Sequence, residues 1–129
     1  MNNKLINVLK NYFVQEKNVS MAFLFGSAAK NRTFKESDID IAVYLKNNNK
    51  RNYHKIWNDI EDLVHYDVDL VNLNDTYPSL AFEAIRGIKL KIKDESFFVN
   101  YMINISQEAV DFQEFILDFW KQKKKLEAA

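Results

Sequence analysis

The chain has 129 residues, of which 18 are basic and 18 acidic, so its formal net charge is zero, and 47% are hydrophobic. This length predicts a single domain over residues 1–129 with one core, and the apolar fraction argues against disorder. The balanced charge argues against extended nucleic-acid binding, and the absence of cysteine excludes disulfides, thiolate metal sites and thiol catalysis.

The N-terminal segment 1–5 lacks the apolar core of a signal peptide, and no apolar run approaches membrane-spanning length. We therefore expect a cytoplasmic protein without a membrane segment.

Hydrophobic periodicity predicts a compact core over about residues 3–93, followed by a long helix. The expected elements are a helix over 3–17, a strand over 21–25, a short helix or turn over 27–33, a strand over 38–45, a helix over 53–64, a strand over 66–73, a helix over 80–86, a strand over 88–93 and an amphipathic helix over about 95–125. Gly87 is expected to end its helix in the left-handed conformation. Ile88, Leu90 and Ile92 alternate with lysines, which predicts a half-exposed edge strand.

Two carboxylates stand out in the second strand. Asp38 and Asp40 are one residue apart, so their side chains lie on the same face of a strand that is otherwise apolar. Unpaired, they would repel each other. Mg²⁺ prefers carboxylate, phosphate and water oxygens, and two such ions suit an in-line displacement at phosphorus. The pair therefore predicts a metal site, with two Mg²⁺ ions expected.

A third carboxylate is expected from a neighbouring strand. Asp69 is the first candidate, and Asp67, on the same face, is the reserve; the sequence does not choose between them. The third carboxylate would bind the metal nearer the nucleophile and help to draw the proton from an attacking hydroxyl.

Gly26 and Ser27 follow the first strand and suggest a phosphate site. Glycine lets the backbone approach a phosphate, and Ser27 adds a hydroxyl and a backbone N–H. Lys30 and Arg32 lie in the following connection and could reach a triphosphate tail.

Gly26-Ser27, ten residues, and then Asp38-Ile39-Asp40 together resemble the motif of the DNA polymerase beta-like nucleotidyltransferase superfamily. Segments 68–73 and 84–90 further resemble the minimal nucleotidyltransferases of prokaryotes. The resemblance implies an α+β fold with a small mixed β-sheet flanked by helices. It also implies that Gly26 and Ser27 bind nucleotide phosphates and that Asp38, Asp40 and Asp69 bind the metals and carry the catalysis.

Members of this family are often antitoxins paired with HEPN ribonuclease toxins. The resemblance therefore implies transfer of AMP from ATP to a hydroxyl acceptor, a tyrosine of the cognate toxin. Two alternatives stay open: a non-catalytic antitoxin that masks the toxin by binding, and an aminoglycoside-type small-molecule nucleotidyltransferase. Base preference and oligomeric state have no local signal.

The C-terminal helix carries more aromatic residues than one face against a small sheet would use. Any of them that remain exposed would mark a protein interface, with either a second copy or a toxin.

Overall fold

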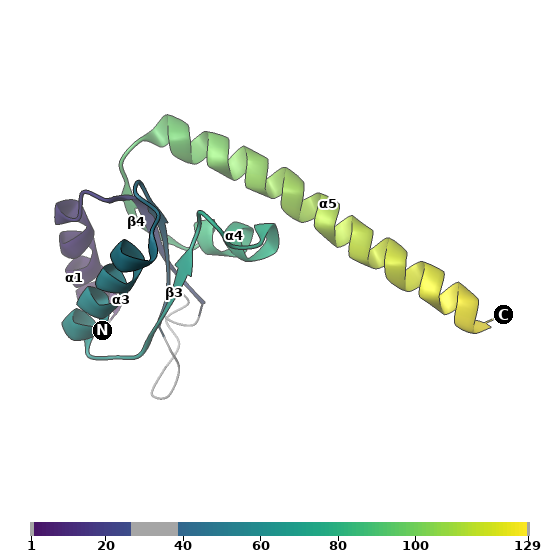
Figure 1. The fold of residues 1–129 in the computed structure, drawn as a ribbon, viewed down its shortest axis with the longest axis horizontal. Helices are drawn as coiled ribbons and strands as arrows, with labels where there is room; N and C mark the ends of the chain where they lie inside the picture. The colour runs from purple at the N-terminus through teal and green to yellow at the C-terminus, as the bar shows by residue number, and fades with distance from the viewer. Residues whose placement is uncertain (1, 27–38, 129) are drawn as a thin grey trace.

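In a computed structural model of the chain, the backbone is described for residues 2–26 and 39–128 (Figure 1). The helices are α1 (Asn2–Gln15), α3 (Lys50–Val64), α4 (Pro78–Ile85) and α5 (Glu95–Ala128), and the strands are β1 (Val19–Phe25), β2 (Ile39–Leu45), β3 (Val68–Asn72) and β4 (Ile88–Ile92). Each expected element in the described ranges is present, with ends that differ by a few residues. The helix or turn expected over 27–33 lies outside those ranges.

The four strands form one sheet in the order β3-β2-β1-β4. β1 pairs antiparallel with both β2 and β4, whereas β2 and β3 are parallel. The parallel pair needs a crossover connection, which α3 supplies. The expected α+β fold with a small mixed sheet is therefore confirmed.

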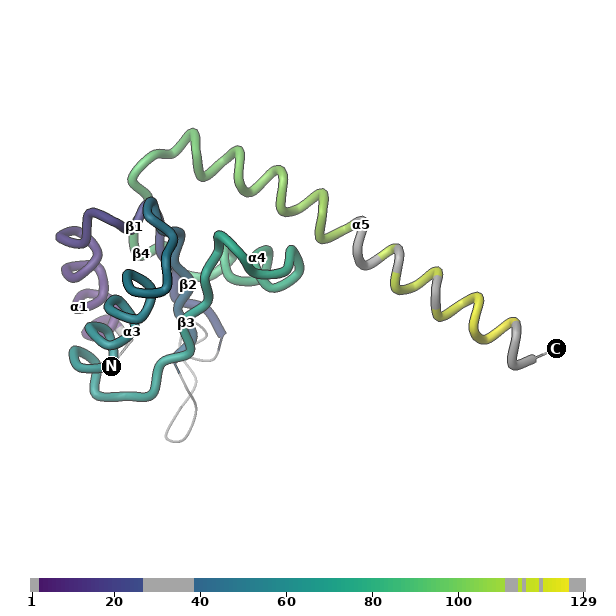
Figure 2. The backbone as a smooth tube through the Cα atoms, in the orientation of Figure 1, coloured from purple at the N-terminus to yellow at the C-terminus, as the bar shows by residue number. Residues whose placement is uncertain are grey.

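Each face of the sheet has its own hydrophobic cluster. Helices α1 and α3 cover one face, where Leu9 and Ile56 belong to the same buried cluster as Ile41. Helix α4 and the start of α5 cover the other, where Ala84 and Phe98 join a cluster with strand residues. Figures 1 and 2 show the two helix layers on opposite sides of the sheet. Because both faces are covered, the central strands β1 and β2 are apolar almost throughout.

Strand β4 departs from the expected alternation. Lys91 pairs with Ala22 but Lys89 pairs with Phe23, so a bulge lies between them. A bulge adds one residue to one strand and shifts the following side chains to the other face. As a result Leu90 belongs to the cluster under α1 and α3, whereas Ile92 packs on the cluster under α4 and α5. The predicted edge strand is confirmed, but a regular strand would have placed Leu90 and Ile92 on one face.

Gly87 does not have the left-handed conformation that we expected, because its φ lies outside that region. A Cβ at Gly87 would lie 2.3 Å from the carbonyl oxygen of Leu24. Glycine is therefore needed here for the close approach of the α4–β4 turn to β1. The left-handed helix end is found instead at His65 after α3, with φ of 58°.

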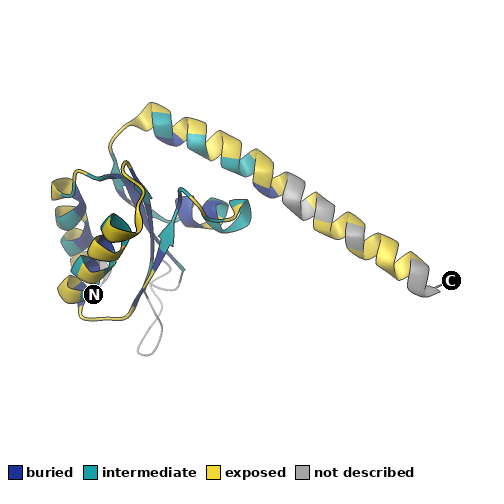
Figure 3. Cartoon of the chain, in the orientation of Figure 1, coloured by how far each residue is buried: buried dark blue, intermediate teal, exposed yellow. Residues whose placement is uncertain are grey.

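The first turns of helix α5 pack on α4, and the rest of α5 extends beyond the sheet (Figure 1). Figure 3 shows that its described residues beyond this contact are mostly exposed. No helix among the described residues is long and apolar enough to cross a membrane.

Candidate active site

Asp40 is the only charged residue in the two central strands β1 and β2. It is half-buried and lies near the start of β2, on the face covered by α4 and α5, because it is two residues before Ala42 of that cluster. Its partner on one side is Phe25, the last residue of β1. A charged side chain at such a position is costly unless hydrogen bonds, a cation or a ligand compensate it.

On the other side of Asp40, the parallel register places Asp69 directly beside it. Paired strands lie about 4.8 Å apart, and residues in register project from the same face. The two carboxylates therefore come from different strands and lie side by side. Their mutual repulsion and their hard oxygen atoms fit a divalent cation such as Mg²⁺.

Asp67 lies two residues before Asp69 and so projects from the same face. Its carbonyl oxygen accepts a hydrogen bond of 2.9 Å from the Ile39 N–H. Asp67 is therefore one pleat away from Asp40, and the register favours Asp69 as the partner of Asp40.

Gly26 follows β1 with φ of 71°, a left-handed conformation that favours glycine. A Cβ at this position would lie 2.2 Å from Oδ2 of Asp40 and 3.1 Å from its Cγ. The Asp40 carboxylate thus lies against the Gly26 backbone. This contact joins the residue expected to approach the phosphates with a residue expected to bind the metal.

The other expected site residues, Ser27, Lys30, Arg32 and Asp38, lie outside the described ranges. Of the seven residues expected in the site, the structure therefore describes Gly26, Asp40 and Asp69, and it brings these three together at one end of the sheet. The described residues alone contain no cluster of three or more metal-binding side chains. Asp38 would complete such a cluster, and this part of the site stays a prediction.

Three α3 residues beside the site were not expected to have a role in it. Tyr53, Trp57 and Glu61 hydrogen-bond the backbone of β3 on either side of Asp69. Burial, and then the charge of Asp69, raise the pKa of the Tyr53 phenol. The sequence placed Tyr53 and Trp57 on the apolar stripe of the helix. Only their hydroxyl and indole N–H groups, which need hydrogen-bond partners when buried, indicated a further contact.

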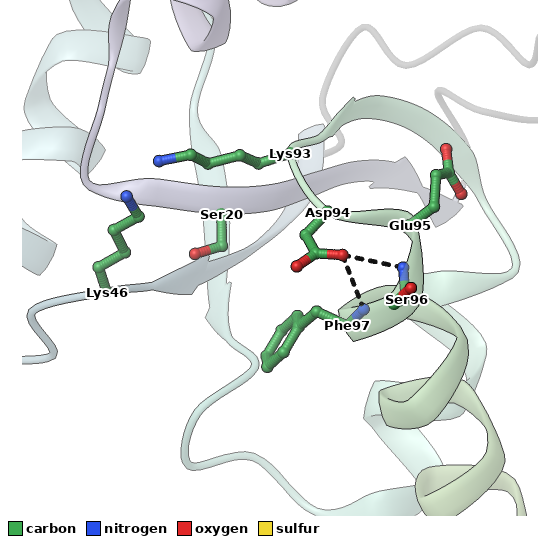
Figure 4. Close-up of a pocket in the computed structure, with 7 residues that line it drawn as sticks. All are labelled: Ser20, Lys46, Lys93, Asp94, Glu95, Ser96 and Phe97. Carbon is green, nitrogen blue, oxygen red and sulfur yellow. Dashed lines mark hydrogen bonds between the residues drawn. The ribbon is translucent and has the colours of Figure 1, made fainter.

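Hollows also lie on other parts of the described surface. One of about 310 Å³ runs along β3 and the start of α4, between Val71 and Tyr77. Another, of about 320 Å³, is lined by Tyr53 of α3 and Asn72 of β3. A larger one, of about 610 Å³, is lined by Lys46 and Lys93 at the strand ends remote from Asp40 (Figure 4). There the Asp94 carboxylate accepts hydrogen bonds from the backbone N–H groups of Ser96 and Phe97 and caps α5.

Comparison with known families shows what this arrangement resembles. The profile described as polymerase beta, nucleotidyltransferase matches residues 7–96. This range covers more than half of the chain and includes Gly26, Asp40 and Asp69. No curated protein matches the chain.

Several solved structures share the fold. A chain of a mutant MntA–HpeT toxin–antitoxin complex aligns with a TM-score of 0.75 and 18% identity over 96% of this chain and 98% of that chain. A chain of a toxin–antitoxin complex with AMP-PNP aligns with a TM-score of 0.73 and 19% identity, over 95% and 98%. A chain of the complex between tri-AMPylated Shewanella oneidensis HEPN toxin and MNT antitoxin aligns with a TM-score of 0.70 and 16% identity, over 92% and 98%. The expected polymerase beta-like fold is thereby confirmed.

Proposed function

Since this chain belongs to the polymerase beta nucleotidyltransferase family, we propose that it transfers AMP from ATP to a tyrosine hydroxyl of a HEPN-type toxin and so acts as its antitoxin. The observation that carries the proposal is the register of Asp40 with Asp69 across the parallel pair β2 and β3. The contact of Gly26 with the Asp40 carboxylate supports the proposal further, because it brings the glycine expected to bind the phosphates beside a residue expected to bind the metal. ATP with Mg²⁺ is the substrate that this combination fits.

In this mechanism Asp40, Asp69 and Asp38 would hold the metal ions, and Gly26 and Ser27 would bind the phosphates. The bound Mg²⁺ would supply positive charge that stabilises the pentacoordinate phosphorus and the leaving group. Asp69 helps to draw the proton from the acceptor hydroxyl. The hydroxyl oxygen forms a bond to the α-phosphorus, the bond from that phosphorus to the bridging oxygen breaks, and pyrophosphate leaves with its electron pair. Lys30 and Arg32 would stabilise the charge of the triphosphate tail.

The acceptor is proposed from the structural neighbours. One of them is a complex that contains a tri-AMPylated HEPN toxin, and another was solved with AMP-PNP. Their identity with this chain is below 25%, so they support the acceptor as a hypothesis.

Transfer of label tests this proposal. The chain is incubated with Mg²⁺, ATP labelled in its α-phosphate, and the protein encoded by the neighbouring gene. We expect label on that protein with the wild type and a loss of at least about 100-fold with Asp40→Asn, because the metal site loses a ligand. Asp62→Asn, an exposed aspartate on α3, is the matched control and should transfer normally. Equal transfer by Asp40→Asn would contradict the proposal.

A second function, toxin masking by binding alone, is favoured by one observation on α5. Five exposed apolar residues recur at helical spacing along one stripe: Val99, Ile103, Val110, Leu117 and Trp120. Leu117 is 62% exposed and Trp120 is 52% exposed, although both are large and apolar. Such a stripe is suited to cover a partner's apolar surface, either the toxin or a second copy of this chain.

Neutralisation of the toxin separates the two functions. If AMP transfer is the basis, Asp40→Asn should bind the toxin but fail to neutralise it at equal dose. If masking is the basis, Leu117→Asp should abolish both binding and neutralisation, whereas Asn104→Asp, an exposed change on another face of α5, should not.

A further inference from the structure

Strand β3 carries Asp69 and lies at an edge of the sheet, so on one side of its backbone there is no neighbouring strand among residues 2–26 and 39–128. The Ile39 N–H donates to the Asp67 carbonyl, and the Leu73 N–H donates to the Val43 carbonyl. In a parallel pair, alternate residues turn their peptide groups toward the partner. The peptide groups of Val68 and Leu70 therefore face away from β2.

Side chains of α3 take the place of the missing strand. The Trp57 Nε1–H donates a hydrogen bond of 2.8 Å to the Val68 carbonyl. Oε2 of Glu61 accepts one of 3.1 Å from the Val68 N–H. The Tyr53 hydroxyl donates to the Leu70 carbonyl. These three residues are spaced four apart, so they form one row along the helix.

The row holds β3 on both sides of Asp69, because Val68 precedes it and Leu70 follows it. The rings of Tyr53 and Trp57 also meet edge to face, with centroids 5.5 Å apart and planes at 76°. This contact restricts the rotation of both donors. Exposed edge strands otherwise fray more readily than central ones, which would displace a metal ligand carried there.

We propose that Tyr53 and Trp57 are positioning residues that hold Asp69 in register beside Asp40 for metal binding, an inference that rests on the proposed nucleotidyl transfer. Neither side chain needs to touch the nucleotide. Their hydrogen bonds to the carbonyls of Val68 and Leu70 fix the position of the backbone at Asp69, and so the position of its carboxylate beside Asp40.

The test compares Tyr53→Phe with Tyr101→Phe. Tyr101 is also half-buried, and its hydroxyl donates a hydrogen bond of 2.8 Å to the carbonyl of Leu73, beyond the end of β3. Both variants keep the ring and lose one hydroxyl–carbonyl bond. Binding of Mn²⁺ with a non-hydrolysable ATP analogue is measured by electron paramagnetic resonance. Hydrogen exchange of peptides covering residues 66–73 is measured without metal.

For Tyr53→Phe we expect the dissociation constant for Mn²⁺ to rise about tenfold and exchange over 66–73 to accelerate. In label transfer, the Mg²⁺ concentration at half-maximal rate should rise by a similar factor, while the rate at saturating Mg²⁺ changes less than about twofold. Tyr101→Phe should leave Mn²⁺ binding unchanged.

Equal Mn²⁺ affinity in Tyr53→Phe, Tyr101→Phe and the wild type would overturn the positioning role, even where label transfer confirms the proposed function. A wild type that binds Mn²⁺ but transfers no label would overturn the proposed function alone. Absence of Mn²⁺ binding by the wild type would overturn both.

Discussion

The two edges of the sheet are protected in different ways. The β4 edge carries two lysines, Lys89 and Lys91, and a bulge. Charged side chains and bulges are common means of preventing edge-to-edge pairing. At the β3 edge, Trp57 and its neighbours on α3 hydrogen-bond the outward peptide groups. The β4 edge is blocked by charge and irregularity, whereas the β3 edge is covered by specific bonds.

The difference follows from what each strand carries. A bulge changes the face of the residues after it, which β4 tolerates because it supplies no expected site residue. The same irregularity in β3 would move Asp69 away from Asp40. An edge strand that carries a site residue therefore needs protection that preserves its register, and side-chain hydrogen bonds provide it.

The largest expected effect distinguishes Asp69 from Asp67, the two candidates for the third carboxylate. Asp69→Asn removes a charged ligand beside Asp40 and should lower the rate of label transfer by about 100-fold or more. Asp67→Asn, on the same face one pleat away, should lower it by less than about tenfold. If Asp67→Asn is the more damaging change, Asp67 is the third carboxylate and the register argument for Asp69 is wrong.

The next effect concerns the bonds that cover β3. Trp57→Phe removes the donor to the Val68 carbonyl and some buried ring, so the free energy of unfolding should fall by about 1–2 kcal/mol. Urea denaturation measures the change. Hydrogen exchange should accelerate over 66–73 and not over 88–92. A uniform acceleration over both edges would show that Trp57 stabilises the whole fold rather than this edge.

A smaller effect is expected at the β4 edge. Lys91 donates a hydrogen bond of 2.9 Å from Nζ to the Glu16 carbonyl, at the end of α1. Lys91→Met should therefore cost about 1 kcal/mol of unfolding free energy without changing Mn²⁺ binding. Lys10→Met, an exposed change on α1, is the control and should change stability little. Weakened Mn²⁺ binding by Lys91→Met would contradict the separation of the two edges.

The smallest effect is a pH dependence. Burial, and then the charges of Tyr44 and Glu108, raise the pKa of Tyr101. Because the pKa of Tyr101 is raised in the folded state, its contribution to the free energy of unfolding is fully present below the unfolded pKa of about 10. That contribution is lost as the pH rises above this value. Between about pH 8 and about pH 11, the free energy of unfolding should therefore fall less for Tyr101→Phe than for the wild type, as measured by denaturation at both pH values. An equal loss would show that this phenol does not contribute.

Much of the fold could be predicted because the patterns that define it are local. The alternation of apolar residues around Asp40 identified β2, and the spacing of Ile56 and Ile60 identified α3. The bulge in β4 could not be predicted, because lysines alternate there with Ile88, Leu90 and Ile92 as in a regular strand. Only the pairing with β1 shows the shift. The left-handed conformation of His65 was also missed, since glycine is the usual residue for it.

The candidate site divides in the same way. Gly26, Asp38 and Asp40 were predicted from a motif whose members lie close together in the chain, and of these the structure describes Gly26 and Asp40. Asp67 and Asp69 share one face of one strand, so no local pattern distinguishes them. Tyr53 and Trp57 fit an apolar stripe, and their hydrogen-bond partners on β3 could not be read from that stripe.

The sequence by itself determined which residues point to the same face of each element, because side-chain direction follows from the local backbone. It therefore determined that Asp40 projects from an otherwise apolar strand that follows Gly26 and Ser27 in the chain. Only the tertiary structure decided that Asp69 lies beside Asp40 and that α3 fastens the strand on either side of Asp69. Register and strand order depend on hydrogen bonds between distant segments, and these form only when the whole sheet assembles.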